Sequence, residues 1–225
     1  MIKSLEYYIN NLNVLYEDNH LLVIEKPENV LSQKDNTNDF DINEIVKEWL
    51  KRKYNKQGNV YLGLVHRLDR RVGGVMVLAK TSKAASRLAK SVQNHEIHKL
   101  YLAYASGIIS HDGNINIKIV KENNIAKIDN NGKDASLSYK VLNNYDNNTF
   151  VLVDLNTGRY NQIRLSFSHI GHPLIGDYKY GCKITNDRIG LWCYEISFIH
   201  PITKEYLEFR LLPNGDFWSG LKYKK

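Results

Sequence analysis

One carboxylate lies among several guanidinium groups in the segment GLVHRLDRRVGG, where Asp69 is within two residues of Arg67, Arg70 and Arg71. A carboxylate that stays ionised can act as a nucleophile. Arginines bind phosphate and carboxylate groups through several N–H donors. The pattern therefore fits an anionic nucleophile in a site that binds a polyanion, and a solvated cluster of salt bridges is the alternative.

Further polar residues stand beside two predicted strands. The segment NTGRYNQIR carries Arg159 and Arg164 directly after a strand, and a helix that begins near Tyr160 would place Arg164 one turn in, where it can reach a cleft at the strand end. Tyr101 alternates with leucines on both sides, so its phenol points to the opposite face. A buried tyrosine hydroxyl needs a partner, which a ligand base or a carboxylate would provide.

Other kinds of chemistry lack their usual motifs. The chain has no GxxxxGK[ST] phosphate loop, no GxGxxG after a strand and no GxSxG elbow, so we expect no nucleotide cofactor. The pairs His95 with His98 and His169 with His172 fall at predicted helix ends, where solvated or capping roles explain them better than a metal. We therefore expect neither a metal nor another cofactor.

The charge balance favours an anionic partner. Lysine and arginine number 31 against 24 acidic residues, which gives a formal charge of +7. Such a surface favours nucleic acid, an acidic membrane or another anion. No apolar run reaches the length of a signal peptide or membrane helix, and Cys182 and Cys193 form no CxxC pair. We expect a cytoplasmic protein that does not bind membranes.

A small set of elements must position these residues. The patterns predict strands over residues 21–24, 59–69, 75–81, 99–107 and 150–155, a hairpin around PITK in 191–212, exposed β structure over 112–148, and helices after Asp41, after Ser82 and over 160–170. Asp69 then lies on a loop before a turn at Gly73 and Gly74. The helices are too few to connect every strand pair in parallel. We expect one α+β domain, residues 1–225, with a mixed, largely antiparallel central sheet and flanking helices.

The motifs taken together, in this order, resemble the RluA-type family of pseudouridine synthases. The matching text is HRLDR at residues 66–70, KLYLA at 99–103, and TGRYNQIR at 157–164 followed by GHPLIGDYKYG at 171–181. VLYEDNHLLVIEKP near the start and LAKTSKAA add support. The resemblance covers most of the chain, from about Val14 to Leu212, and implies the pseudouridine synthase catalytic fold.

The resemblance implies isomerisation of uridine in ribosomal or transfer RNA without a cofactor. It makes Asp69 the nucleophile or the acid/base group at the ribose, and leaves the two routes open. It assigns Tyr101 to stacking on the base and removal of the C5 proton, and Arg164 to pairing with Asp69. The residues expected to contact RNA are Arg67 as a wedge or phosphate clamp, together with Arg70, Arg71, Lys80, Arg159 and Asn161.

The chain departs from the family in two motifs. After HRLD the family usually has Thr-Ser-Gly two residues on, whereas this chain has Val72, Gly73 and Gly74. Asn161 stands where the family commonly has histidine, and its amide cannot titrate. These changes fit an unusual substrate or reduced turnover. The segment before Val14 is too short for an S4-type RNA-binding domain, so we expect substrate choice to rest on the catalytic domain and the protein to be a monomer.

Two other functions stay open. A non-catalytic RNA-binding protein on the same fold would explain the lost hydroxyls after HRLD. A glycosidase-like hydrolase would need a second acid, and none is evident around Asp69 in the sequence. We expect His66 to shape its loop, and Gly176 and Asp177 to form a supporting turn.

Overall fold

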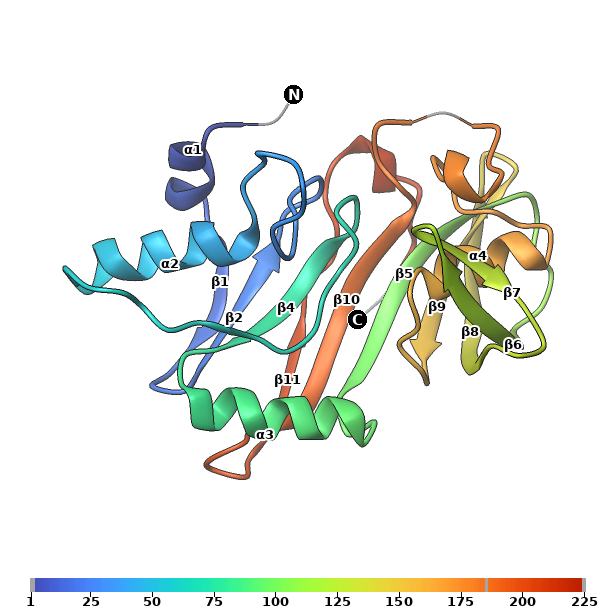
Figure 1. The fold of residues 1–225 in the computed structure, drawn as a ribbon. Coiled ribbons are helices and arrows are strands. Elements are labelled where there is room, and N and C mark those ends of the chain that lie inside the picture. The colour runs from blue at the N-terminus through green and yellow to red at the C-terminus, as the bar shows by residue number, and fades with distance from the viewer. Residues whose placement is uncertain (1–2, 185, 224–225) are drawn as a thin grey trace. The chain divides into compact units, whose positions relative to one another are not determined.

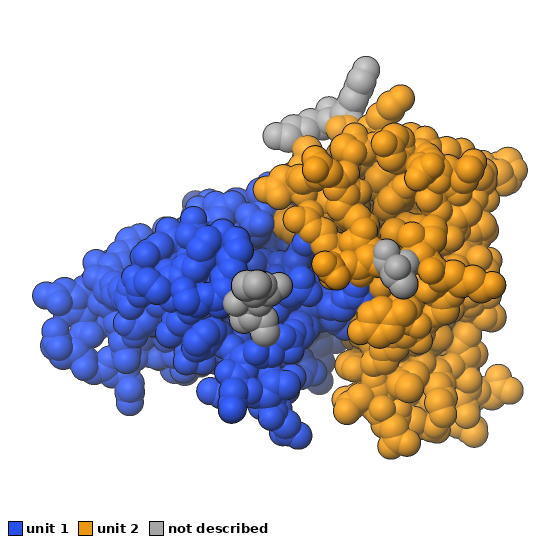
Figure 2. All heavy atoms as spheres, turned by 90° about the horizontal axis from the view of Figure 1, so that it is seen from above, with its two compact units in different colours: residues 1–97, 195–211 blue, residues 98–194, 212–225 orange. Residues whose placement is uncertain are grey.

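The chain folds into two compact units. The computed structural model describes residues 3–184 and 186–223. Unit 1 comprises Met1–Ile97 and Glu195–Leu211, and unit 2 comprises His98–Tyr194 and Leu212–Lys225 (Figure 2). The boundary falls within strand β10, Leu191–Ile199, so this strand contributes residues to both units.

Unit 1 is built on a sheet with strand order β1-β2-β4-β10-β11. Its strands are β1 (Val14–Glu17), β2 (Leu21–Lys26), β4 (Gly73–Ala79), the second half of β10 and β11 (Tyr206–Arg210), and the short β3 (Gly63–Leu64) pairs with the end of β4. The β1–β2, β2–β4 and β10–β11 pairings are antiparallel. The predicted strand at 21–24 and the predicted hairpin around PITK are confirmed.

Helices cover both faces of this sheet (Figure 1). Leu22 and Ile24 face a core shared with α1 (Leu5–Asn10) and α2 (Ile42–Lys53), whereas Leu21 and Val23 face a core shared with α3 (Ser82–Gln93). Both faces of β2 are thus apolar because both are buried. The predicted start of α2 is confirmed, since the Asp41 carboxylate caps the helix by accepting a 2.7 Å hydrogen bond from Glu44 N.

Three local predictions in unit 1 are wrong. Of the strand predicted over residues 59–69, only β3 (Gly63–Leu64) is a strand. Gly73 and Gly74 do not form a turn but begin β4, where Gly74 pairs with Lys26 and adopts φ 124°, a value that favours glycine. The cap of α3 is Thr81, not Ser82, and its hydroxyl accepts from Ala84 N at 3.2 Å. The N-cap residue has an extended backbone and a side-chain oxygen that accepts from the first turn, and Thr81 meets both conditions, so Ser82 is the first helical residue.

Unit 2 contains an antiparallel sheet with strand order β5-β9-β8-β6-β7. Its strands are β5 (His98–Ser106), β6 (Gly113–Glu122), β7 (Ile125–Ile128), β8 (Lys133–Tyr145) and β9 (Asn148–Leu155). Helix α4 (Gln162–His169) and the 3₁₀ turns η1 (Tyr178–Tyr180) and η2 (Asp216–Trp218) follow. The predicted β structure between residues 112 and 148 is confirmed.

The helix predicted over 160–170 begins two residues later than expected. Asn161 adopts φ 50°, so the chain is left-handed there and regular helix starts at Gln162. Ile163 and Phe167 of this helix are buried.

The predicted α+β class with a mixed, largely antiparallel sheet and few helices is confirmed. The pairings whose register is described are antiparallel, and an isolated bridge between Leu31 and Asp41 is parallel. Within residues 3–184 and 186–223, no helix has the length and apolar character needed to cross a membrane.

Candidate active site

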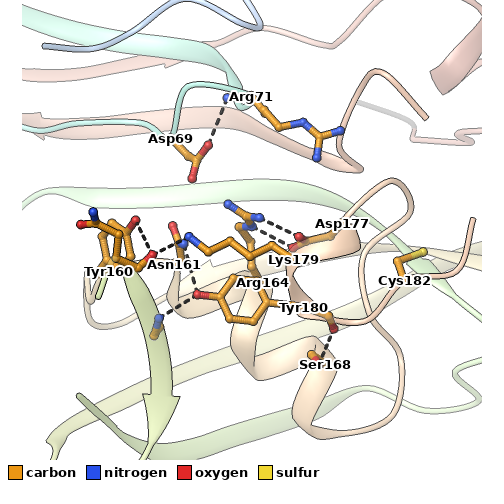
Figure 3. A network of polar contacts seen from close by, with 12 residues as sticks. Asp69, Arg71, Tyr160, Asn161, Arg164, Ser168, Asp177, Lys179, Tyr180 and Cys182 are labelled. Atoms are coloured by element: carbon orange, nitrogen blue, oxygen red, sulfur yellow. Dashed lines mark hydrogen bonds and ion pairs between the residues drawn. The ribbon is translucent and has the colours of Figure 1, made fainter. Parts of the chain in front are cut away.

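Asp69 lies in unit 1 on the loop between β3 and β4, as predicted. Its Oδ1 accepts a hydrogen bond from Arg71 N at 3.1 Å, and its carbonyl oxygen accepts from Val72 N at 3.0 Å. Figure 3 shows the carboxylate reaching its neighbour's backbone. An aspartate that bonds the backbone two residues on has a defined side-chain direction. The carboxylate is therefore oriented by its own turn.

Alternate residues of this loop are anchored to the rest of unit 1. His66 Nε2 accepts a hydrogen bond from Val77 N at 3.0 Å, which confirms that His66 shapes the loop. Ser32 Oγ donates to Leu68 O at 2.6 Å and accepts from Leu68 N at 3.1 Å. These contacts hold the chain on both sides of residue 67.

A third anchor is the fully buried ammonium group of Lys26. Its Nζ donates to the carbonyl oxygens of Pro27, Val30 and Arg70 at 2.8, 2.7 and 3.2 Å. Three acceptors match the three N–H bonds of an ammonium. Lys26 therefore ties the end of β2 to the residue that follows Asp69.

Lys26 and Asp69 also interact electrostatically. Burial lowers the pKa of Lys26 to about 7, while the charges of Asp69 and Glu28 act to raise it and the charge of Arg70 acts to lower it. Lys26 was not among the predicted site residues, because its one signal in the sequence is a lysine at the end of an apolar strand.

The basic residues near Asp69 differ in what they contact. Arg67 is exposed. Arg70 forms a 2.6 Å ion pair with Asp39. Lys80 pairs with Glu17 at 2.5 Å and donates to the Asp18 carbonyl at 2.6 Å. We therefore assign Lys80 to the stability of unit 1, and its predicted contact with RNA gains no support.

The pKa of Glu17 reflects its ion pair with Lys80. Its partial burial acts to raise its pKa, but hydrogen bonds from Lys53, Lys80 and Tyr54 lower the pKa to about 2. The carboxylate is ionised at neutral pH and keeps the Lys80 side chain in place.

In unit 2, Arg164 forms a buried, bidentate ion pair with Asp177. Nε donates to Oδ2 at 2.8 Å and Nη2 donates to Oδ1 at 2.6 Å. The exposed fractions of the two side chains are 6% and 0%. Parallel hydrogen bonds of this kind fix the plane of a guanidinium. Asp177 was predicted only as a turn former, and its carboxylate has this second role.

Tyr180 supports the same arginine from one side (Figure 3). The guanidinium carbon of Arg164 lies 5.0 Å from the Tyr180 ring centre. The Tyr180 hydroxyl accepts from Ala126 N at 2.9 Å and from Asn161 Nδ2 at 3.2 Å. Asn161 thus acts through Tyr180, and it is a residue type that tolerates a left-handed backbone.

Arg159 is tied to the sheet of unit 2. Its Nε donates to the Asp134 carbonyl on β8 at 2.9 Å, and its backbone N donates to Gln162 Oε1 at 2.9 Å. This geometry favours a structural role for Arg159.

Tyr101 on β5 is 6% exposed, so the predicted burial is confirmed. Burial first, and then the neighbouring Cys193 thiol, raises the pKa of Tyr101 well above its ordinary value. Burial also raises the pKa of Cys193 to about 12 and lowers the pKa of nearby Lys99. Tyr101 is therefore a neutral phenol at neutral pH, and a ligand base as the partner of its hydroxyl stays a prediction.

The predicted site residues are divided between the units. Unit 1 holds Asp69, Arg67, Arg70, Arg71 and Lys80, and unit 2 holds Tyr101, Arg159, Asn161 and Arg164. The pairing of Arg164 with Asp69 stays a prediction. Among the described residues, no three histidine, cysteine, aspartate or glutamate side chains gather so that they could hold a metal ion.

Comparison with known proteins identifies the family. The model of the RNA pseudouridylate synthase family matches residues 20–169. The chain is 33% identical to ribosomal large subunit pseudouridine synthase D of Haemophilus influenzae, over 92% of this chain and 68% of that protein. Identity to the protein of the same name from Pseudomonas aeruginosa is 35%, over 76% of this chain and 53% of that protein. The chain thus spans from about half to just over two thirds of the length of these two relatives.

Solved structures share the fold. Human RNA pseudouridylate synthase domain containing 4 superposes with a TM-score of 0.80 at 20% identity, over 96% of this chain and 94% of that one. Human RNA pseudouridylate synthase domain containing 1 gives 0.75 at 22% identity, over 91% and 84%. The chain belongs to the RluA-type family of RNA pseudouridylate synthases, enzymes that isomerise uridine in RNA.

Proposed function

We propose that this enzyme converts uridine to pseudouridine in large-subunit ribosomal RNA, with Asp69 as the nucleophile. The observation that carries the proposal is the Asp69 carboxylate, oriented by its own turn within the matched family region and anchored from behind by Lys26. The names of the relatives from Haemophilus influenzae and Pseudomonas aeruginosa support ribosomal RNA as the substrate. A cytoplasmic location and a monomeric state stay predictions.

The reaction balances without any co-reactant. The N1–C1′ bond of the uridine breaks, the base turns, and a C5–C1′ bond forms. The proton on C5 passes to water and N1 takes up a proton, so substrate and product are isomers. Asp69 either adds to C1′ or assists elimination at the ribose, and both routes need its ionised form.

We assign roles to the other residues from their burial and their contacts. Tyr101 stacks on the base, and removal of the C5 proton by its phenolate is disfavoured because burial raises its pKa. Arg164, whose plane is fixed by Asp177, acts in the same reaction as an oriented cation. The exposed Arg67 contacts the RNA backbone or replaces the extruded base.

Release of tritium from RNA labelled at uridine C5 tests the proposal. Transcripts of large-subunit ribosomal RNA are incubated with the purified protein alone, with a transfer RNA pool alongside. We expect release from the ribosomal transcripts, loss of release in Asp69→Asn, and RNA binding by that variant close to that of the wild type. Asp35→Asn is the matched control, because it makes the same change at an exposed position of unit 1.

Other outcomes distinguish the alternatives. Tritium release from transfer RNA alone would show that transfer RNA, and not ribosomal RNA, is the substrate. RNA binding without release by the wild type would favour the non-catalytic RNA-binding protein, and free uracil would show a hydrolase. Full activity in Asp69→Asn would refute the nucleophile.

A further inference from the structure

Unit 1 contains a cavity beside the Asp69 loop. Its volume is about 340 Å³, and its lining residues are Gln33, Asn43, Leu64, Val65, His66 and Arg67. Clefts that hold small ligands typically start at about 300 Å³ and combine apolar walls with a few polar groups. Leu64 and Val65 provide apolar atoms, and the other lining residues provide hydrogen-bonding groups.

Asn43, on the first turn of α2, is the lining residue whose amide has an unpaired atom. Its Oδ1 is buried and accepts no hydrogen bond from any residue that the structure describes. Buried polar atoms are nearly always paired, and leaving one unpaired costs about 1–3 kcal/mol. The amide also carries two N–H donors, so a partner that offers one donor and one acceptor side by side would satisfy it.

Another residue of the lining adds donors. The exposed Arg67 carries a guanidinium that can stack on a flat ring or bind a phosphate. A ring with polar edges, joined to a phosphate, matches this combination.

The cavity is also close to the proposed nucleophile. Arg67 and Asp69 are two residues apart, so their Cα atoms are separated by at most roughly 7 Å. Enzymes that act on a base extrude it, and its neighbours in the strand lose stacking partners. A nucleobase that has lost its stacking partner in this way needs another binding site near Asp69.

We propose that this cavity binds an unpaired nucleobase of the RNA strand, one next to the target uridine, with the Asn43 amide hydrogen-bonded to the polar edge of that base. This proposal rests on the proposed function in one respect, because it takes the bound strand to be the RNA substrate of that reaction. It makes Asn43 a specificity residue that contacts a nucleotide other than the one that reacts.

Binding of single nucleotides tests the cavity without catalysis. The ¹⁵N-labelled full chain is titrated with each of the four nucleoside 5′-monophosphates, and with ribose 5-phosphate as the ligand without a base. We expect saturable shifts of the Val65 and Arg67 amide signals with at least one nucleotide, with a dissociation constant on the order of 1 mM, and none with ribose 5-phosphate. Asn43→Ala should lose this binding, and Asn59→Ala, the same change at an exposed position, should keep it.

Three results of this titration would overturn the proposal: no saturable shift with any nucleotide, equal shifts with ribose 5-phosphate, or unchanged binding by Asn43→Ala. The comparison of ligands in the wild type decides the question even where Asn43→Ala does not fold. Absence of isomerase activity would refute the proposed function and leave this result untouched.

The link to the reaction is tested with an RNA that shows tritium release. Each nucleotide next to the target is replaced in turn by an abasic residue. At one position we expect the wild type to bind about tenfold more weakly, as for loss of one good base contact, and Asn43→Ala to show no further loss there. Equal losses in both proteins at every position would contradict the role of Asn43.

Discussion

Replacing Asp177 by asparagine should destabilise unit 2, because it removes the charge that balances buried Arg164. The two side chains have exposed fractions of 0% and 6% and share hydrogen bonds of 2.8 and 2.6 Å. Loss of one partner from a buried ion pair typically costs about 3–5 kcal/mol. Asparagine keeps the shape and one acceptor oxygen, so we expect a loss of about 3 kcal/mol in the free energy of unfolding.

Urea unfolding followed by tryptophan fluorescence measures this loss. Trp49 lies in unit 1, whereas Trp192 and Trp218 lie in unit 2, so a Trp49→Phe background reports on unit 2. Asp154→Asn is the matched control, since Asp154 is an exposed aspartate of the same unit.

A double-mutant cycle decides whether the cost comes from the unbalanced charge. Arg164→Met alone should also destabilise unit 2, because it leaves the Asp177 carboxylate buried without its cation. The variant with both changes should be more stable than the sum of the single effects by about 2 kcal/mol or more. Additive effects, or a loss below about 1 kcal/mol in Asp177→Asn, would refute the reasoning.

Three further predictions follow from other contacts. Above about pH 7 the folded chain loses the Lys26 proton, whereas the unfolded chain keeps it up to about pH 10.5, so unfolding takes up a proton. The free energy of unfolding should therefore rise by about 2–3 kcal/mol from pH 7 to 9 in the wild type relative to Lys26→Met. Urea unfolding of both proteins at both pH values measures this rise, and identical pH dependence would count against it. RNA affinity should fall with added salt with a log–log slope of about −2 to −3, as for contacts by three arginines; filter binding at several salt concentrations measures it, and a flat response would contradict a phosphate-led interface. If Tyr101 acts by stacking, Tyr101→Phe should isomerise at least about tenfold faster than Tyr101→Leu in the tritium assay; equal rates would exclude stacking as its role.

Elements with strong local signals could be predicted from the sequence. The Asp41 cap and the helical spacing of its apolar residues determined α2, and the apolar run at 21–24 determined β2. Signals that depend on backbone angles were less certain. Gly74 opens a strand instead of a turn, because a positive φ suits glycine in either place.

The active-site motifs could be located, but not the contacts that support them. Arg164 and Asp177 were both singled out, and only the fold shows that they form one buried pair. Lys26 gave almost no signal, because its role depends on a carbonyl group 44 residues away. Cys193 was noted only as having no CxxC partner, and its position beside Tyr101 arises from the fold of unit 2.

The sequence by itself determined the family, the class of reaction and the position of Asp69 on a loop between strands, because these depend on residue types and on local spacing. The tertiary structure alone decided which polar groups are buried and what satisfies them. Burial sets the cost of an unpaired charge, and it depends on residues that are distant in the chain. The anchoring of the loop by Lys26, the orientation of Arg164 by Asp177 and the neutral state of Tyr101 follow from that packing.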